Sequence, residues 1–252
     1  MNSIVCVKRV PESDTRVRIA DDGRSIDPSG VKYTLNPYDE YAVEEAISLR
    51  EEAGEGSVTV LTVGGDESQE TLRTALAMGA DEAVLLRPDG EAPPSDALAV
   101  ARALAAELED RDFDLLLFGK QAIDDDNMQV PAMVAELLGI PCATVIVEME
   151  VGDGRVTARR EVEGGHEEAV LELPAAIAAQ KGLNEPRYAS LKGIMAAKKK
   201  PLEEKDVALE PSGLELVALE EPPEPEAGEI LGDGPEAAPE LARRLREEAK
   251  VL

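Results

Sequence analysis

The residues best suited to hold a ligand lie in one polar segment near the middle of the chain, at 119–129, with the sequence GKQAIDDDNMQ. This segment follows an apolar run at 115–118 and leads into apolar residues at helical spacing over 133–138. Gly119 permits a close backbone approach, the amide side chains offer hydrogen bonds, and the helix start near Asn127 exposes N–H groups that attract anions. Together these features could hold a phosphate.

The three aspartates of this segment, at 124–126, complicate a phosphate site. Carboxylates repel phosphate unless they cap the helix, bind ribose hydroxyls or coordinate Mg²⁺. The spacing alone therefore leaves two interpretations open, a phosphate site and an acidic capped loop. The sequence has no GxGxxG, P-loop or EF-hand pattern that would decide between them.

The composition excludes several kinds of catalytic site. One histidine, His166, is too few for most Ser-His-Asp, Cys-His and His-rich zinc arrangements. Cys6 and Cys142 match neither a disulfide framework nor a CxxC metal site, so we expect two buried thiols in a reducing compartment. We therefore predict no catalytic residue and no metal site in this chain.

The charge balance excludes electrostatic binding to nucleic acid. The 252 residues include 26 Lys and Arg against 53 Asp and Glu, a formal net charge of −27. No apolar run approaches the roughly 20 residues of a membrane helix, and residues 1–10 lack the apolar stretch of a signal peptide. We expect a cytoplasmic protein without direct membrane insertion. Aromatic residues are only 2%, so a bound flavin would need contacts from elsewhere.

The first 140 residues alternate the patterns of buried strands and helices. The apolar runs that predict strands are residues 3–7, 57–63, 83–86 and 115–118. Helical stripes are found at 38–53, 72–79 and 96–108. Asn36 before Pro37 resembles a helix cap, and Asp66 with Gln69 resembles a capping box. This order predicts an α/β, Rossmann-like, mostly parallel sheet whose ligand crevice lies beyond the carboxyl ends of its strands.

Later residues predict an antiparallel extension of that sheet. Strand patterns at 143–151, 155–162 and 168–173 are separated by glycine-containing hairpin turns. Residues 175–180 could form one more buried strand. Two further loops, 36–39 and Gly64-Gly65, are expected at the sheet edge that also holds the 119–129 segment, so three loops could surround one small nucleotide.

The chain is then expected to form a projecting C-terminal arm. Residues 220–239 are rich in Pro, Glu, Gly and Ala and should be a linker, and 241–252 should be an amphipathic helix that needs a docking surface. We divide the chain into 1–190, an α/β nucleotide-binding domain, and 191–252, comprising the arm, the linker and the terminal helix.

Several strings in the sequence are specific enough to indicate a family. They are NEPRY at 184–188 with KKK at 198–200, GKQAIDDD at 119–126 and TALAMGAD at 74–81. On these strings, and from CVKRV at 6–10 to about residue 201, the chain resembles the electron transfer flavoprotein β subunit.

The resemblance implies an electron carrier rather than an enzyme. Its α subunit would hold most of a redox-active FAD, and the β subunit would bind AMP in an obligate heterodimer. Electrons would come from acyl-CoA and related dehydrogenases, as in fatty acid β-oxidation, and leave toward a quinone oxidoreductase.

The resemblance also assigns the AMP contacts, and most of them lie in the 36–39 loop and the 119–129 segment that the spacing had indicated. They are Cys6, Asn36, Pro37, Tyr38, Asp39, Val63, Gly119, Lys120, Gln121, Ala122, Ile123, Asp124, Asp125, Asp126, Asn127, Met128, Gln129 and Val130. Val130 stands where the family is expected to have a small polar residue that contacts phosphate.

Two alternative functions stay open. Relatives that bifurcate electrons hold a second FAD in place of AMP, but the run Asp124-Asp125-Asp126 has no glycine in the middle and resembles the AMP-binding type. A nucleotide-binding sensor of the universal stress type would bind ATP alone and need no α subunit.

A second segment is assigned to partner recognition by the resemblance. It comprises Tyr188, Ala189, Ser190, Leu191 and Lys192, and Leu191 would enter an apolar pocket of a partner dehydrogenase. One buried leucine contributes about 2 kcal/mol, which suits a transient interface. Leu191 could instead be a core residue. The lysine cluster at 198–200 could attract an acidic partner surface or lie in solvent. The resemblance also suggests Glu161 as a residue near the α subunit.

Overall fold

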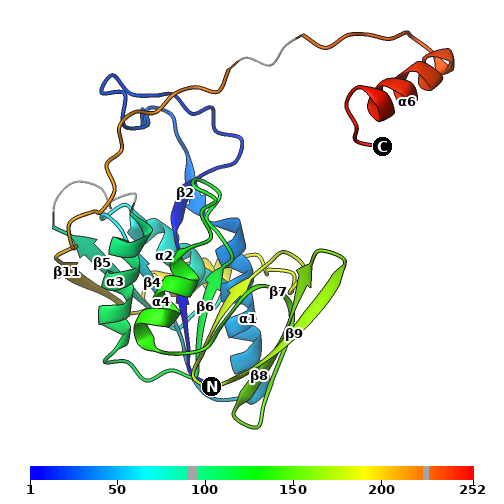
Figure 1. The fold of residues 1–252 in the computed structure, drawn as a ribbon. Coiled ribbons are helices and arrows are strands. Elements are labelled where there is room, and N and C mark those ends of the chain that lie inside the picture. The colour runs from blue at the N-terminus through cyan, green and yellow to red at the C-terminus, as the bar shows by residue number, and fades with distance from the viewer. Residues whose placement is uncertain (90–95, 224–226) are drawn as a thin grey trace.

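The computed structural model describes residues 1–89, 96–223 and 227–252. Most of them surround one nine-stranded sheet with the order β11-β5-β4-β1-β6-β10-β7-β8-β9 (Figure 1). Its strands are β1 (Ser3–Cys6), β4 (Val58–Val63), β5 (Glu82–Pro88), β6 (Leu115–Gly119), β7 (Cys142–Gly152), β8 (Arg155–Val162), β9 (Gly165–Glu172), β10 (Ala175–Ala179) and β11 (Leu202–Val207). Neighbouring strands are parallel except in the β7-β8-β9 meander. The predicted fold class is confirmed.

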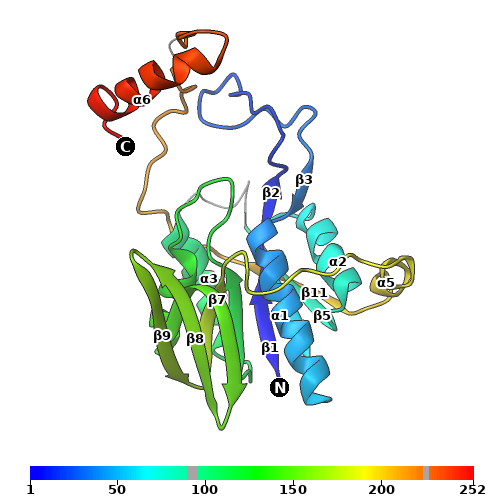
Figure 2. The same cartoon turned by 90° about the vertical axis from the view of Figure 1, so that its right-hand side faces the viewer.

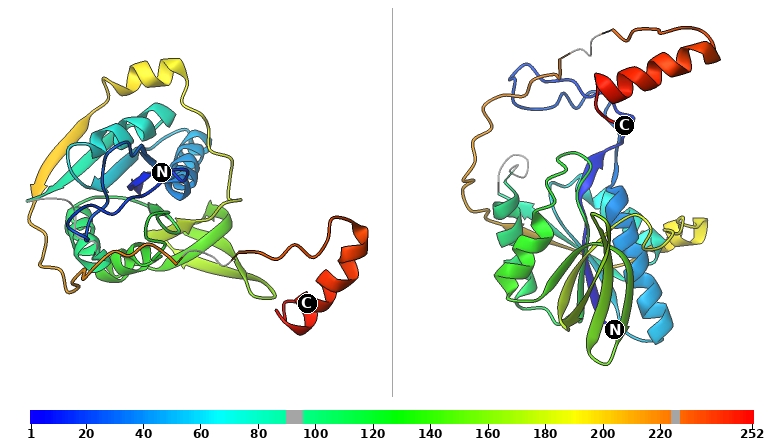
Figure 3. Two further views of the ribbon diagram at one scale, coloured as in Figure 1. Left: turned by 90° about the horizontal axis from the view of Figure 1, so that it is seen from above. Right: turned by 45° about the vertical axis from the view of Figure 1, so that its right-hand side comes forward.

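Helices cover both faces of the parallel part of the sheet (Figure 3, left). On one face, α1 (Pro37–Ala53) and α2 (Ser68–Met78) pack against one apolar cluster, and on the other α3 (Ala97–Leu108) and α4 (Val130–Leu138) pack against a second. The central strands β1 and β6 are buried along their whole length, because their side chains contact a helix layer on each side. The resulting frame fixes the carboxyl ends of the strands at one edge.

The antiparallel extension forms around a tight hairpin turn. Asp153 and Gly154 between β7 and β8 both have positive φ, 51° and 73°, as a two-residue hairpin loop requires. The buried strand predicted at 175–180 is β10, which inserts in parallel between β6 and β7. The extension therefore continues directly from the parallel part of the sheet.

Two of the predicted helix starts differ from the structure. Helix α2 has Glu67 as its N-cap residue, so the capping box expected at Asp66 is wrong, and Asp66 Oδ1 instead accepts a hydrogen bond from Arg87 Nη1 at 3.1 Å. Helix α4 begins at Val130, with Gln129 as its N-cap residue, three residues beyond the start expected near Asn127. The Asp66 and Asn127 side chains instead accept hydrogen bonds from Arg87 and from Gln129 N.

Part of the expected C-terminal arm returns to the sheet. Strand β11 pairs in parallel with β5, from Leu202 opposite Ala83 to Val207 opposite Pro88. Its sequence LEEKDV is mostly charged, which is normal for an edge strand with solvent on one side. The short helix α5 (Leu191–Ala197) and the small ribbon of β2 (Arg9–Pro11) with β3 (Tyr33–Leu35) were also not expected from the sequence.

The last residues lie apart from the sheet. Leu219 N donates a hydrogen bond to Gly23 O at 2.8 Å, so this segment runs beside the long loop between β2 and β3. Beyond it, α6 (Ala238–Glu247) lies away from the body of the molecule (Figures 1 and 2). Residues 224–226 of the predicted linker lie outside the described residues. No helix in the described ranges is long and apolar enough to cross a membrane.

Candidate functional site

A cleft opens at the carboxyl ends of β1, β4 and β6, the edge at which an open α/β sheet is expected to bind its ligand. Its empty volume, including the mouth, is about 590 Å³, which suits a small molecule. It is lined by Cys6, Val7, Lys8, Asp39, Val63, Val100, Leu104, Phe118, Gly119, Gln121, Ala122, Asp125, Asn127, Met128, Gln129, Val130 and Pro131.

Asp39, in the first turn of α1, joins three parts of this cleft. Its Oδ2 accepts a hydrogen bond from Lys8 N (2.7 Å), and its Oδ1 accepts from Gly119 N (3.0 Å) and Asn36 Nδ2 (2.9 Å). Burial raises the pKa of the Asp39 carboxyl to about 7, although all three hydrogen bonds favour the charged form. The carboxylate is therefore a buried acceptor that holds the ends of β1 and β6 against α1.

Gly119 is required by this close approach. A Cβ atom at this position would lie 2.4 Å from Asp39 Oδ1 and 2.6 Å from the backbone carbon of Tyr38. Any side chain would therefore push the 119–129 segment away from α1. The sequence suggested Gly119 for a close approach to a ligand, and the structure shows a close approach to Asp39 and Tyr38 of this chain.

Asn36 is the N-cap residue of α1 and Pro37 follows it, as expected, but the Asn36 side chain makes no capping hydrogen bond. Its Nδ2 donates to Asp39 Oδ1 and to Gln121 O (2.8 Å), and its Oδ1 accepts from Ile123 N (3.3 Å). The side chain is drawn toward these partners because it is almost completely buried and each of its polar atoms needs one. Asn36 thus fastens the 119–129 segment to the start of α1.

The aspartates of this segment are paired with a lysine. Lys8 Nζ lies 2.8 Å from Asp124 Oδ1 and 3.0 Å from Asp125 Oδ2. Burial alone would lower the pKa of Lys8, but its hydrogen bonds to Asp124 and Asp125 outweigh burial and raise it. The carboxylates that would repel a phosphate are therefore partly neutralised by a cation of the same cleft.

Local hydrogen bonds shape the rest of the segment. Asn127 Nδ2 donates to Asp125 Oδ2 (3.2 Å), Asn127 Oδ1 accepts from Gln129 N (3.1 Å), and Gln121 Nε2 donates to Asp126 Oδ1. Asp126 and Met128 have positive φ values, 50° and 56°, which non-glycine residues adopt only when their surroundings hold them there. The segment is therefore a constrained loop.

The groups in the cleft are suited to binding rather than to covalent chemistry. Burial raises the pKa of the Cys6 thiol well above its ordinary value, so it is uncharged and a poor nucleophile. Asp39 is fully engaged by backbone and amide donors. Among the described residues no group of three or more His, Cys, Asp or Glu side chains is arranged to hold a metal ion.

Comparison with known proteins identifies the family. Residues 24–210 match the family described as "Electron transfer flavoprotein domain". The chain is 45% identical to the electron transfer flavoprotein subunit beta of Bacillus subtilis (strain 168), with all of both chains covered. It is 42% identical to the mitochondrial subunit beta of Oryza sativa subsp. japonica, again over all of both chains, and 38% identical to that of Mus musculus, over 100% of this chain and 99% of the relative.

The chain belongs to the electron transfer flavoprotein β subunit family. It is therefore a subunit of an electron carrier rather than a classical enzyme. The family match confirms the resemblance drawn from the strings at 74–81, 119–126 and 184–188.

The residues predicted to contact a nucleotide fall into two groups, those that line the cleft and those that do not. Those that line the cleft are Cys6, Asp39, Val63, Gly119, Gln121, Ala122, Asp125, Asn127, Met128, Gln129 and Val130. Those that do not are Asn36, Pro37, Tyr38, Lys120, Ile123, Asp124 and Asp126. Of the second group, Asn36 and Asp124 reach the cleft through hydrogen bonds to residues that line it, and Lys120 Nζ lies 5.0 Å from the centroid of the Tyr38 ring.

Sequence reasoning did not assign several of the lining residues. Lys8 is the most informative, and its position directly after a predicted strand is a signal that could have identified it. Val100, Leu104 and Phe118 form part of an apolar side of the cleft, but they look like ordinary core residues in the sequence. Their role depends on the packing of α3 against the sheet.

The segment assigned to partner recognition lies at the surface beside α2 (Figure 2). Tyr188 is 99% exposed and Leu191 77% exposed, so Leu191 is not a core residue of this chain. Ala189 is half-buried, Ser190 caps α5 through its Oγ, which accepts from Gly193 N at 3.0 Å, and Lys192 is exposed.

The lysine cluster at 198–200 is only partly a surface feature. Lys198 and Lys199 are exposed, but Lys200 Nζ donates to Leu76 O at 3.0 Å and to Ala80 O at the end of α2. The expectation of three free cations is therefore wrong for Lys200, because it satisfies carbonyl groups that the end of α2 leaves unpaired. Glu161 is exposed on β8, opposite His166 of β9.

Proposed function

We propose that this chain binds AMP in the cleft and, as the obligate partner of an α subunit that holds most of the FAD, carries electrons from dehydrogenases to a quinone oxidoreductase. The observation that supports AMP is the cleft itself, which combines an apolar side with a polar loop at the carboxyl edge of the sheet. A nucleotide with a flat base and a charged phosphate matches that division.

The first turn of α4 is suited to the phosphate. Val130 and Pro131 line the cleft, and the intrahelical hydrogen bonds begin only at Met133 N, which donates to Gln129 O at 3.1 Å. The N–H groups of Val130 and Ala132 precede that point and have no partner within the helix, so they attract an anion, whereas Pro131 has no N–H to donate. Val130 can contribute its backbone to this contact although it lacks a polar side chain.

The apolar side of the cleft is suited to the base. Val63, Val100 and Leu104 come from the end of β4 and from α3, and they offer a surface for a flat ring. Phe118 is the one aromatic residue among the lining residues of the described chain, and it is only 4% exposed. This scarcity favours AMP over a second flavin, whose ring system is usually held by more aromatic contact.

The proposal of an α-subunit partner is supported by helix α6, which lies apart from the sheet of this chain. Helix α6 exposes Leu241, and it contacts the preceding turn, Pro235–Ala237, and Glu229 through Arg244 at 2.6 Å, both in the segment just before the helix. An isolated helix of ten residues is marginal in water, so it needs a docking surface. We propose that residues 1–190 form the nucleotide-binding domain and that 191–252 holds the arm that docks on the α subunit, the docking part being 208–252 because β11 pairs with β5.

The donor side is supported by the exposed recognition segment. We propose that Tyr188, Ala189, Ser190, Leu191 and Lys192 dock on acyl-CoA and related dehydrogenases, with Leu191 as the anchor. An exposed leucine that becomes buried only in the complex contributes to binding and not to folding.

Leu191→Ala in the heterodimer tests this assignment. We expect the dehydrogenase concentration for half-maximal electron uptake to rise by roughly 30- to 150-fold, equivalent to about 2 to 3 kcal/mol of binding. Val170→Ala is the control, because Val170 is also exposed, at 59%, but lies on β9 at the far edge of the sheet. A large drop in melting temperature with unchanged uptake would contradict the docking role.

A further inference from the structure

Helix α5 is too short to order itself. It has seven residues, and a helix of this length is not stable in water without tertiary contacts. Yet this region exposes four large apolar side chains, Tyr188, Leu191, Ile194 and Met195, at 99%, 77%, 46% and 65%. The contacts that order the segment must therefore be made by its two ends and by the side that rests on α2.

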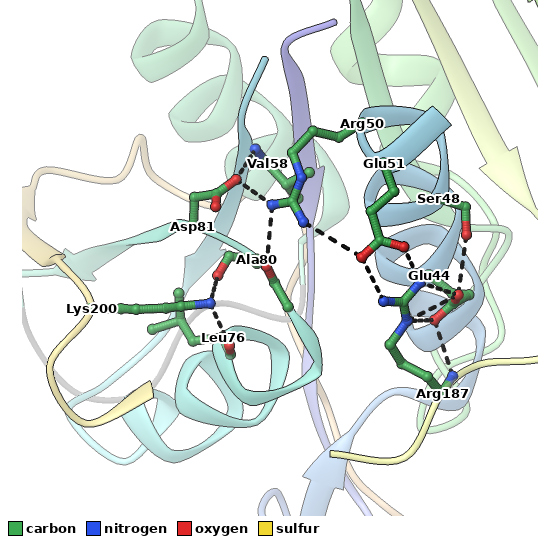
Figure 4. Close-up of polar contacts among 11 residues, drawn as sticks. Glu44, Ser48, Arg50, Glu51, Val58, Leu76, Ala80, Asp81, Arg187 and Lys200 are labelled. Carbon is green, nitrogen blue, oxygen red and sulfur yellow. Dashed lines mark hydrogen bonds and ion pairs between the residues drawn. The ribbon is translucent and has the colours of Figure 1, made fainter. Parts of the chain in front are cut away.

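The amino-terminal end is fixed by Arg187 (Figure 4). Its guanidinium contacts Glu44 through Nε at 2.8 Å and Nη2 at 2.9 Å, and it contacts Glu51 through Nη1 at 2.9 Å and Nη2 at 3.0 Å. The backbone N–H of Arg187 also donates to Glu44 Oε2 at 3.0 Å. Both carboxylates belong to α1, so the start of the segment is fastened to the main body of the fold.

The carboxylate of Glu44 is an unusual partner because it is buried, with its side chain only 8% exposed. It also accepts from Ser48 Oγ at 3.1 Å. Burial would raise the pKa of Glu44, but the hydrogen bonds from Arg187 outweigh burial and lower it, so the pair is ionised at neutral pH. A planar guanidinium can make a two-point contact with each of two carboxylates, which the single nitrogen of a lysine cannot do.

The carboxyl-terminal end is fastened to α2. Arg73 Nη1 donates to Ala197 O and to Lys200 O at 2.8 Å, while Lys200 Nζ donates back to Leu76 O and Ala80 O (Figure 4 shows the Lys200 contacts). Gly193 allows the helix to sit directly on α2, because a Cβ there would lie 2.4 Å from Ala77 O. The two ends are therefore held by different helices.

We propose that Arg187 is a positioning residue, which acts through Glu44 and Glu51 to hold the apolar side chains of 188–195 in a fixed arrangement for a partner protein. This inference rests on the proposed docking function of the segment. A segment that is already ordered loses less conformational freedom on binding, so its affinity is higher for the same contacts. Arg187 would then affect docking without touching the partner or the flavin.

The test is electron uptake by the heterodimer from a reduced acyl-CoA dehydrogenase at increasing dehydrogenase concentration. In Arg187→Gln, we expect the half-saturating concentration to rise at least 10-fold and the limiting rate to change less than 2-fold. Arg187→Lys should have a half-saturating concentration between those of the wild type and Arg187→Gln, because lysine keeps the positive charge but loses the planar guanidinium. In a Leu191→Ala background, Arg187→Gln should raise the half-saturating concentration by a smaller factor than it does alone, because Leu191 is one of the side chains that Arg187 positions.

A milder pair of variants covers the case in which Arg187→Gln does not fold. Glu51→Gln weakens one arm of the contact and leaves Glu44 in place, so we expect a rise of about 2- to 4-fold in the half-saturating concentration, with an unchanged melting temperature. Glu52→Gln is the matched control, because it makes the same change one residue away. Glu52 has no hydrogen bond or ion pair to any residue that the structure describes.

Three results would overturn the proposal. One is a half-saturating concentration that stays at the wild-type value in Arg187→Gln and Glu51→Gln although Leu191→Ala raises it. Another is a multiplicative effect of Arg187→Gln and Leu191→Ala, because Arg187 would then act elsewhere. If Leu191→Ala itself changes nothing, the docking function fails, and the positioning role fails with it.

Discussion

Replacement of Asp39 by asparagine should remove a pH dependence from the stability of this chain. The Asp39 carboxyl is 5% exposed and joins Lys8 N, Gly119 N and Asn36 Nδ2. Its pKa rises from 3.8 to about 7 in the folded chain, mainly because burial disfavours the charge. A carboxyl with a raised pKa binds its proton more tightly in the folded state, so its contribution to stability is present at low pH and is lost as the pH rises through the folded value.

The size of this effect follows from the shift. The folded pKa of about 7 is two units above pH 5, so at pH 5 the carboxyl is mostly protonated in the folded chain. In the unfolded chain it is mostly ionised at that pH. At about 1.4 kcal/mol per unit, the contribution is about 3 kcal/mol, and almost all of it is lost by pH 8. The carboxamide of Asp39→Asn does not titrate, so the difference between wild type and variant isolates this group.

Urea unfolding of the purified chain at pH 5, 6, 7 and 8 measures that difference. We expect the free energy of unfolding of the wild type, minus that of Asp39→Asn, to fall by about 3 kcal/mol over this range. Asp153→Asn, in the turn between β7 and β8, controls for the loss of one negative charge from a chain of net charge −27. If the difference in unfolding free energy does not change with pH, the inference that burial disfavours the charged form of Asp39 is refuted.

Other predictions concern the same cleft. Asn127→Leu should lower the AMP content of the purified heterodimer, measured by chromatography of the released nucleotides, because Asn127 holds both Asp125 and Gln129 N; AMP at wild-type occupancy would contradict the loop assignment. Gly119→Ala should lower the stability by about 1 to 3 kcal/mol in urea unfolding, because its Cβ would overlap Asp39, and an unchanged midpoint would argue against this packing. Mass spectrometry after alkylation should find Cys142 modified before Cys6, since Cys6 is more deeply buried; the opposite order would be inconsistent with the burial of Cys6.

The sheet and its ligand edge could be predicted because their signals are local. The run LLLF at 115–118 is apolar on both faces, and Gly119 follows it at once, so strand, turn and loop are visible within a few residues. Strand β11 could not be recognised in this way. Its LEEKDV pattern reads as a solvated loop, and it becomes a strand only because the edge of β5 is available for pairing.

The candidate site was harder to predict where one residue has several possible partners. Asn36 before Pro37 has the pattern of a helix cap, but Gln121 and Ile123, which are distant in sequence, compete for its side chain and prevail. Lys200 looks like one of three free cations until α2 places Leu76 O and Ala80 O beside it. Such contacts depend on tertiary packing, so residue types alone do not reveal them.

The nucleotide content of the assembled protein tests the central claim most directly. The chain is purified alone and also co-expressed with its α subunit, and the nucleotides released by denaturation are identified and counted by chromatography and mass spectrometry. We predict that the chain alone is colourless and that the heterodimer is yellow, with one FAD and one AMP per complex. A stoichiometric flavin in the isolated chain, two FAD and no AMP in the heterodimer, or ATP as the sole nucleotide would each contradict the assignment.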